Sequence, residues 1–397
     1  MRCRHFGPPD HCGGCTRQHI AYPDQLRLKT ELVDRLVRAA VPDAPATRPT
    51  MPSTPLDDPW GYRHRVHFVF GQRKPNRVCA TGEGGSTAAP LLMGHYVRGT
   101  RRVFDAKECP VHDPRGNAIA FSFARTFEKE RIEAAAGGRG VLRGIVVRVG
   151  ARTGETMATL VVANDGDRRL RAATRRAMQE GEAPSSLHLN LHPKGDAFIF
   201  GRDTRRISGP ERMRESVADT SFLISSTAFF QTNVPTAEIL VNLVLQEVPA
   251  GARVLDLYAG AGLFAVPLAR AGHDVTAIEE HRPAVSDGEA TLRLNTLTTD
   301  RCRFIAKRVE TALTSVRTGS VDAVVLDPPR EGCTASVLDE VFGRLRPARA
   351  IYVSCNPEAL ARDLAIAARL RYVIRSLQPV DMFPHTDHIE TVAVLTR

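Results

Sequence analysis

The segment VLDLYAGAGLFA at residues 254–265 decides the fold class of this 397-residue chain. A short apolar run leads directly into a turn that is rich in glycine. Similar apolar runs recur at HDVTAIEE (273–280), VDAVVLDPP (321–329) and AIYVSCN (350–356), with helical patterns between them. This alternation is typical of a doubly wound parallel sheet. We therefore predict an α/β domain over residues 215–397.

Reactive and charged side chains stand where the predicted strands end. Four of them fall at or just past a strand end: Asp256, Glu279, Asp327 and Cys355. In doubly wound sheets, ligands bind in the crevice outside the carboxyl ends of the strands. We expect these four side chains to converge on one crevice.

The glycine turn allows two interpretations. Gly260, Gly262 and Ala265 match the dinucleotide fingerprint, and Glu279 lies downstream where an acidic residue is expected, so a nicotinamide dehydrogenase is one candidate. Asp256 favours another ligand. A carboxylate four residues before the first glycine would repel a pyrophosphate, whereas it suits a cofactor with an ammonium and a sulfonium. We therefore favour a sulfonium methyl donor.

Three further motifs supply candidate chemistry. In DPPR (327–330), two prolines without amide donors force an extended turn beside the crevice. In SCNP (354–357), Pro357 suits a helix start, so the helix dipole is expected to lower the pKa of Cys355 and make it a nucleophile; a buried structural cysteine is the alternative. In FPHTDHIE (383–390), Glu390 can serve as a base, and a metal site at the two histidines would need more ligands.

Composition divides the rest of the chain into two zones. Residues 1–50 hold three clustered cysteines and a predicted helix at 23–40. They run into VPDAPATRPTMPSTP (41–55), which is typical of a linker or irregular connector. Residues 51–214 carry alternating strand patterns and helical patterns near 116–135 and 167–180, which predict a mixed α/β domain.

The charge and the cysteines restrict the partners. A net charge of +10, mostly from arginine, favours a polyanion such as RNA, although a GC-rich genome also encodes arginine in place of lysine. No apolar run reaches about eighteen residues and no cleavable leader is evident, so we expect a cytoplasmic protein without a membrane or an obligate protein partner. Cys3, Cys12 and Cys15, with Cys109 downstream, suit zinc or an iron–sulfur cluster.

The ordered set of motifs resembles the uracil-C5 RNA methyltransferase family, which modifies 23S ribosomal RNA or the T-loop of tRNA. Its members with an iron–sulfur cluster that act on 23S rRNA are the most similar. The motifs are FFQTN (229–233), DLYAGAGLF (256–264), AIEE (277–280), DPPR, SCNP and FPHTDHIE. The resemblance is firm over the C-terminal third. It is looser over the N-terminal cysteines, WGYRHR (60–65) and DAKECPVHDPR (105–115).

This resemblance implies a Rossmann-like class I methyltransferase domain, with a mixed α/β central domain and an N-terminal cysteine-cluster segment. It implies that Cys355 adds to carbon 6 of uracil and that Glu390 removes the proton from carbon 5. Four positions match the family's S-adenosylmethionine site: Gln231, Tyr258, Glu279 and Asp327. Some members carry Asn where this chain has Leu263, so a polar cofactor contact is expected to be missing.

The resemblance also favours a [4Fe-4S] cluster on Cys3, Cys12, Cys15 and Cys109, although the family spacing between the first two ligands is often shorter. The chain lacks the C-x3-C-x2-C motif of radical enzymes, and Cys79, Cys302 and Cys333 are interpreted as ordinary cysteines. Some relatives carry an RNA-binding barrel before the cluster. Here the cluster begins at Cys3, so we expect no barrel and infer that other domains hold the RNA. Candidate phosphate contacts are Arg63, His64, Arg65, Arg98, Arg101 and Arg102.

By analogy with the relatives that the chain resembles, the absence of a barrel and the cysteine cluster make 23S rRNA the expected substrate, with the tRNA T-loop as the alternative. Two other classes remain. An amino-group methyltransferase also uses a DPP-type turn but needs no thiol. A non-catalytic iron–sulfur RNA-binding protein would explain the charge and the cysteines, but it gives no reason for Cys355 and Glu390 at strand ends.

Overall fold

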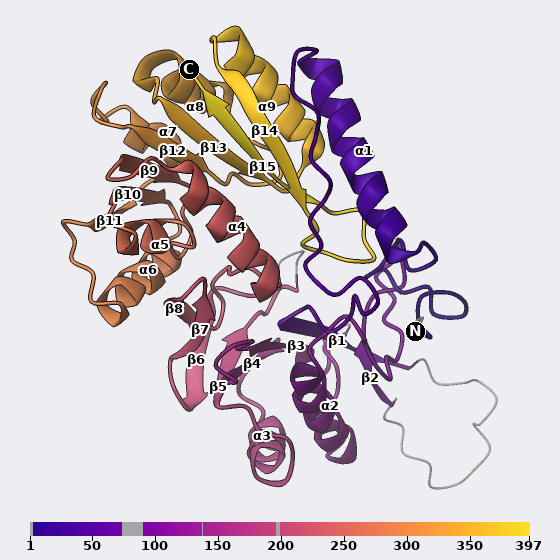
Figure 1. Cartoon of the computed structure of the whole chain (residues 1–397). Helices are drawn as coiled ribbons and strands as arrows, with labels where there is room; N and C mark the ends of the chain where they lie inside the picture. The colour runs from indigo at the N-terminus through magenta and orange to yellow at the C-terminus, as the bar shows by residue number, and fades with distance from the viewer. Residues whose placement is uncertain (1–2, 74–89, 137, 196–198) are drawn as a thin grey trace, which may run out of the picture. The chain divides into compact units, whose positions relative to one another are not determined.

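The computed structural model describes residues 3–73, 90–136, 138–195 and 199–397, and Cys79 lies outside them. The chain forms two compact units (Figure 1). One combines Met1–His19 with Trp60–Met213, and the other combines Ile20–Pro59 with Arg214–Arg397. None of the described helices has the length and apolarity needed to cross a membrane.

The C-terminal unit is built on a seven-stranded sheet of order β11-β10-β9-β12-β13-β15-β14. Its strands are β9 (Arg253–Leu257), β10 (Asp274–Glu279), β11 (Cys302–Ala306), β12 (Ala323–Leu326), β13 (Arg349–Ser354), β14 (Val373–Val380) and β15 (Glu390–Thr396). The strands β9 to β13 are parallel, as predicted, whereas β15 runs antiparallel to both of its neighbours.

Helices and a hairpin complete this unit. The helices are α1 (Tyr22–Ala40), α4 (Val234–Glu247), α5 (Ala265–Arg270), α6 (Arg282–Leu294), α7 (Val309–Leu313), α8 (Ala335–Leu338), a π-helical segment (Asp339–Leu345) and α9 (Pro357–Arg369). The hairpin pairs β7 (Arg212–Val217) with β8 (Thr220–Ser225), and β8 packs on α6. Ala218 and Asp219 at its tip both have positive φ (46° and 57°), which matches the twist that a two-residue hairpin turn needs.

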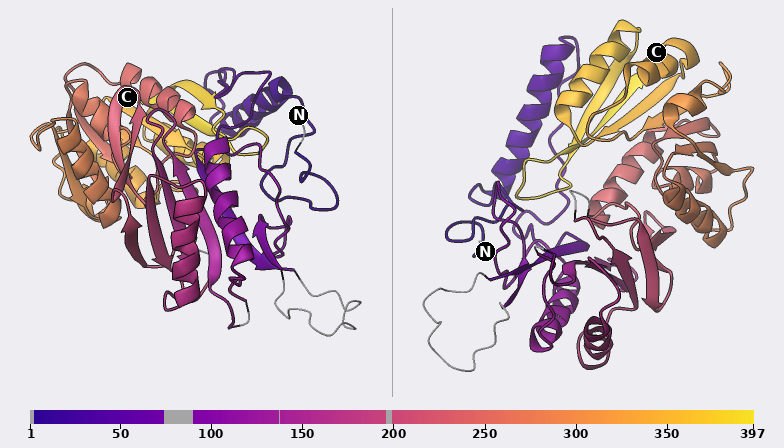
Figure 2. Two further views of the ribbon diagram at one scale, coloured as in Figure 1. Left: turned by 90° about the horizontal axis from the view of Figure 1, so that it is seen from below. Right: turned by 180° about the vertical axis from the view of Figure 1, so that it is seen from behind.

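The N-terminal helix α1 belongs to this C-terminal unit, not to the cysteine segment predicted over residues 1–50. It lies along α9 and β14 (Figures 1 and 2). Val33 and Val37 are fully buried in the hydrophobic core on that face of the sheet. The proline-rich stretch is not a free linker, because the amide of Met51 donates to Pro379 O at 3.0 Å and Met51 bridges to β14. Because the apolar face of α1 is buried in the C-terminal unit, the boundaries between the two units lie at residues 20 and 60, and not at residue 50 as predicted.

The N-terminal unit has a six-stranded sheet of order β2-β1-β3-β4-β5-β6. Its elements are β1 (Arg65–Gln72), β2 (Leu91–Gly94), α2 (Pro114–Lys129), β3 (Leu142–Val149), β4 (Thr156–Val162), α3 (Arg168–Glu180), β5 (Ser186–Leu191) and β6 (Asp203–Ser208). The pairing of β4 with β5 is parallel, and α3 forms the crossover between them, while the other pairs are antiparallel. Because α2 packs on β1, β2, β3 and α3, this unit has the predicted mixed α/β character.

Candidate functional site

The strand order of the C-terminal unit places five candidate residues at one edge of the sheet. The strands β10, β9, β12, β13 and β15 are consecutive neighbours. Glu279 ends β10, Tyr258 follows β9, Asp327 follows β12, Cys355 follows β13 and Glu390 begins β15. Because β15 is antiparallel, its first residue lies at the same edge as the carboxyl ends of the other four strands. The topology thus collects side chains that are 132 residues apart in the sequence, from Tyr258 to Glu390.

Cys355 and Glu390 face each other across the β13–β15 pair. Ser354 is the register partner of Thr391, so the next position on each strand is Cys355 on one side and Glu390 on the other. Cys355 is half-buried and Glu390 is 5% exposed. The burial of Glu390, together with the nearby Asp327, holds its pKa well above the usual range of a glutamate.

The predicted lowering of the Cys355 pKa is wrong for the protein without ligands. Loss of solvent raises the pKa of this thiol to about 11, and the carboxylates of Glu390 and Asp327 add to the effect, while Arg330 opposes it. The helix start offers little help, because the Asn356 side chain accepts from the amides of Glu358 (3.0 Å) and Ala359 (3.5 Å) and so caps α9 itself. Burial and negative charge therefore outweigh the helix dipole.

Asp256 does not stand past the end of its strand. It lies inside β9, opposite Ala277 and Val325, and is fully buried. Neither carboxyl oxygen has a hydrogen-bond partner among the described side chains, and burial raises its pKa well above the usual value. Burial disfavours the charged form of Asp256, so this residue gives little support to the electrostatic argument drawn from the sequence.

The glycine turn is shaped by backbone conformation and by Glu279. Gly262 has a φ of 88°, and a Cβ there would lie 2.8 Å from the Phe304 ring and 2.9 Å from Val266, so only glycine fits. The amides of Gly260 and His281 donate to Glu279 Oε2 and Oε1 at 3.0 and 2.7 Å. Each carboxylate oxygen keeps a second lone pair, which a ligand hydroxyl can use.

The turn after β12 is held by residues that the sequence did not single out. Asn356 Nδ2 donates to Arg330 O at 2.9 Å and so joins DPPR to SCNP. The buried carboxylate of Asp363 accepts from Tyr352 OH at 2.6 Å and from the Cys333 amide at 2.8 Å. An Asn before a helical Pro is a recognisable cap signal, whereas an Asp within a helix gives no sign that it is buried.

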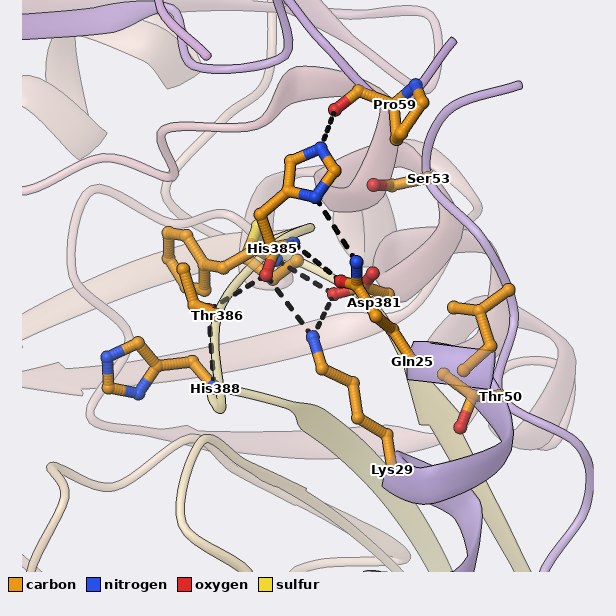
Figure 3. Close-up of polar contacts among 12 residues, drawn as sticks. Gln25, Lys29, Thr50, Ser53, Pro59, Asp381, His385, Thr386 and His388 are labelled. Atoms are coloured by element: carbon orange, nitrogen blue, oxygen red, sulfur yellow. Dashed lines mark hydrogen bonds and ion pairs between the residues drawn. The ribbon is translucent and has the colours of Figure 1, made fainter. Parts of the chain in front are cut away.

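The loop that leads to Glu390 is anchored on α1 (Figure 3). Lys29 Nζ lies 2.6 Å from Asp381 Oδ1 and donates to Phe383 O at 3.2 Å, and both charged groups of the pair are buried. The amide of His385 donates to Gln25 Oε1 at 2.8 Å, and His385 Nε2 lies 3.1 Å from Pro59 O. His385 is thus a buried structural residue, and burial lowers its pKa to about 4.

The FFQTN segment lies between β8 and α4. Asn233 caps α4, and its Nδ2 donates to Ser53 Oγ at 3.0 Å and to Met382 O at 2.9 Å. Gln231 is half-buried beside it, and Phe229 is 64% exposed. A large aromatic ring in contact with solvent is available to a ligand, because its packing contacts within the chain are few.

All four candidate metal ligands lie in the N-terminal unit and line one cavity of 140 Å³. Cys12, Cys15 and Cys109 are buried and Cys3 is half-buried. Mutual proximity of the thiols contributes to their raised pKa values, and burial raises the pKa of Cys15 to about 11. In the described part of the chain, no three of these four sulfurs lie within 4.8 Å of one another.

The six candidate phosphate contacts differ in exposure. Arg98 donates to the carbonyls of Cys15 (2.5 Å) and Cys12 (3.5 Å), so it braces the cysteine loop. Arg65 lies over the Phe200 ring at 5.6 Å, and burial lowers its pKa to about 10. Arg63 and His64 are half-buried, whereas Arg101 and Arg102 are exposed and remain the most accessible candidates.

Comparison with known proteins adds three findings. A model of the tRNA (uracil-5-)-methyltransferase family matches residues 210–397. Uncharacterised RNA methyltransferases of Thermosynechococcus vestitus and Gloeobacter violaceus are 34% and 35% identical, each over 98% of this chain and over 82% and 81% of the relative. The crystal structure of Pyrococcus abyssi tRNA (uracil-54, C5)-methyltransferase in complex with S-adenosyl-L-homocysteine is similar with a TM-score of 0.77 and 26% identity, covering 96% of this chain and 86% of that one.

Replacing Lys29 with Met is expected to lower the free energy of unfolding by about 3–5 kcal/mol, because Asp381 is left buried without its cation. Urea denaturation followed by circular dichroism measures the change. Arg27→Ala on the same helix, which breaks an exposed pair with Glu31, should cost less than about 1 kcal/mol. A Lys29→Met/Asp381→Asn double variant should recover part of the loss. A Lys29→Met protein as stable as wild type would contradict the buried pair.

Replacing Asp327 with Asn is expected to stabilise the protein at pH 8 and to have little effect near pH 4. Burial raises the Asp327 pKa from 3.8 to about 7 in the folded protein. Between these two pH values Asp327 is ionised in the unfolded chain but still protonated in the folded protein. Wild type therefore loses stability as the pH rises from 4 to 7. Urea denaturation at a series of pH values tests the sign. Asp322→Asn is the matched control, since pairing with Arg253 lowers the Asp322 pKa to about 2 and its loss should destabilise above pH 4. If the free energies of unfolding of Asp327→Asn and wild type differed by the same amount at every pH, the raised pKa of Asp327 would be ruled out.

Proposed function

Since this chain belongs to the tRNA (uracil-5-)-methyltransferase family of S-adenosylmethionine-dependent RNA methyltransferases, we propose that it methylates carbon 5 of one uridine in 23S rRNA through a covalent Cys355 adduct. The predicted fold class, a Rossmann-like methyltransferase domain with a mixed α/β unit, is confirmed. A nicotinamide dehydrogenase is excluded by this membership. The observation that carries the mechanism is the register of β13 and β15, which sets Cys355 opposite Glu390.

S-adenosylmethionine supplies an electrophilic methyl group, and four residues of this chain are proposed to hold it: Gln231, Tyr258, Glu279 and Asp327. Glu279 is suited to ribose hydroxyls, because its carboxylate is fixed by two backbone amides and keeps lone pairs free. Asp327 stands two strands along from Glu279, at the end of β12 and next to the strand that leads to Cys355, where it can face the donor or the uracil edge. Leu263 is 9% exposed in the turn, so it offers a ligand little surface and no polar group.

The thiol and the acid have complementary roles in the proposed reaction. Carbon 5 of uracil is a weak nucleophile, and a bond from Cys355 Sγ to carbon 6 turns the ring into an enolate that takes the methyl group at carbon 5. Glu390 then removes the proton from carbon 5, the bond between Sγ and carbon 6 breaks, and the thiolate is released. The target base must leave its stack to reach Sγ.

The electrostatics of the crevice suit a cationic methyl donor. In the protein without ligands, Glu390 and Asp327 raise the pKa of the thiol, and Arg330 is the nearby group that lowers it. A positive charge bound among these acids would favour their ionised forms and the thiolate together. The ionisation of Cys355 would therefore be coupled to binding of the donor.

Denaturing gels with 5-fluorouridine RNA and S-adenosylmethionine test the covalent step. Wild type should form an adduct, because fluorine at carbon 5 blocks proton removal, and Cys355→Ala should form none and lose turnover. Glu390→Gln should accumulate an adduct with ordinary uridine RNA, since the methylated intermediate keeps its carbon 5 proton. Cys302→Ala, a buried cysteine on β11, is the control with normal adduct formation. Methylation by Cys355→Ala would instead indicate an amino-group methyltransferase.

The choice of RNA rests on two opposing observations. The four cysteines, which line one cavity, support 23S rRNA through the resemblance to the family members with an iron–sulfur cluster. The similarity to the Pyrococcus abyssi tRNA enzyme supports the tRNA T-loop as the alternative. Mapping of 5-methyluridine in rRNA and tRNA from cells with and without the gene should show one 23S site lost. Loss of the T-loop methyl group alone would favour the alternative. No change in either RNA would favour a non-catalytic RNA-binding protein.

We also propose that Cys3, Cys12, Cys15 and Cys109 hold a [4Fe-4S] cluster. A tetrahedral zinc ion with Zn–S bonds of about 2.3 Å would bring its sulfurs to about 3.8 Å from one another. No three of these described thiols lie within 4.8 Å of one another, so they are not gathered as closely as a zinc ion requires, and a larger cluster suits them better. The cluster would hold the N-terminal loop to the segment around Cys109. Iron and acid-labile sulfide in anaerobically purified protein measure its presence.

A further inference from the structure

Beside the four thiols, the N-terminal unit holds a second set of donors. One ligand atom each from His95, Cys109 and His112 lies within 4.8 Å of the other two, and Cys109 and His112 are buried. We propose that these three residues bind a Zn²⁺ ion when the iron–sulfur cluster is not assembled. The two metals are alternatives, because both use the Cys109 thiolate. This inference concerns the metal chemistry of the unit and does not depend on the uridine mechanism.

The orientation of His112 is fixed by Asn117. Asn117 Nδ2 donates to Cys109 O at 2.9 Å, which turns its Oδ1 toward His112 Nδ1 at 3.2 Å. Nδ1 is therefore the protonated nitrogen of His112, and Nε2 carries the lone pair that a metal needs. Metal-binding histidines commonly have a partner of this kind on the second ring nitrogen. The side-chain amide of Asn117 also binds the backbone carbonyl of Cys109, so a single residue positions two of the three ligands.

His95 has a buried nitrogen that the described residues leave without a partner. Its Nε2 makes no hydrogen bond in the described part of the chain, which is costly for a buried polar atom. The His95 ring stacks on Phe68 at 4.9 Å and meets the His112 ring at 5.3 Å in an edge-on arrangement. Packing thus limits the rotation of the ring, and a bound cation would satisfy its unpaired nitrogen.

The donor set suits zinc more than other abundant divalent ions. Two imidazole nitrogens and one thiolate are borderline to soft ligands, which Mg²⁺ and Ca²⁺ avoid. Bonds of about 2.0–2.3 Å to zinc would need the three donors to be about 3.3–3.8 Å apart, so side-chain rotations on the order of 1 Å complete the site. The fourth position would be filled by solvent, since none of the other three thiols belongs to this group of described residues.

Co²⁺ is the probe for this site, because its absorption reports both geometry and thiolate ligands. The full-length protein is stripped of metal under reducing conditions and titrated with Co²⁺, then with Zn²⁺ in competition. A Cys3→Ser/Cys12→Ser/Cys15→Ser variant cannot hold the cluster. It should still bind one tetrahedral Co²⁺ per chain, with charge-transfer intensity for a single thiolate. Zn²⁺ should displace the Co²⁺.

Variants of the second donor set, unlike the triple-serine variant, should lose affinity for Co²⁺. His95→Gln and His112→Gln should each weaken Co²⁺ binding by at least about tenfold, and Asn117→Ala should weaken it by about 10–100-fold through the orientation of His112. Circular dichroism checks that the variants are folded. If the triple-serine variant does not fold, the Co²⁺ titration is done on wild type stripped of metal. Its charge-transfer absorption is then expected to have the intensity of a single thiolate ligand.

Two outcomes would overturn the inference. One is a Co²⁺ spectrum with three or four thiolates in wild type that the histidine variants do not change. The other is a folded triple-serine variant that binds no Co²⁺. Iron and sulfide analysis of wild type gives a separate result, so a cluster found together with either outcome would retain the iron–sulfur proposal and reject the zinc site.

Discussion

Desolvation of acidic groups at one edge of the parallel sheet is the constraint from which the chemistry of the C-terminal unit follows. Glu390 is buried and Asp327 is half-buried at this edge, and their pKa values rise because burial penalises the charged form. Cys355 shares this environment, and Arg330 is the cation that moderates it. A cation bound at this edge would favour the ionised forms of these acids, and the sulfonium of a methyl donor is such a cation.

The same edge needs rigid support, and much of it comes from the N-terminal end of the chain. Lys29 and Gln25 on α1 hold the loop that carries Asp381 and His385, which ends at Glu390. The buried ion pair is satisfied on both sides, because Lys29 also reaches a carbonyl of the loop. A glutamate positioned at the start of an antiparallel strand by such contacts would lose little further entropy in the proposed role of a base.

The N-terminal unit concentrates sulfur and nitrogen donors around Cys109. The thiols of Cys3, Cys12 and Cys15 form one set of donors with Cys109, and the imidazoles of His95 and His112 form a second set with it. Softness of the ligands favours iron–sulfur chemistry at the first set and zinc at the second. Because the two proposed sites share the Cys109 thiolate, the metal content would depend on how the protein is supplied with iron and sulfide.

The sequence by itself determined the alternation of strands and helices, the glycine turn and the residues at strand ends, because each depends on a pattern of a few neighbouring positions. Cys355 and Glu390 could be named for this reason. Only the tertiary structure decided that α1 completes the C-terminal core, that β15 runs antiparallel, and that Lys29 pairs with Asp381 across 352 residues. It also reversed the expected shift of the Cys355 pKa. Burial and charge at a site are sums over distant segments, and no local pattern encodes them.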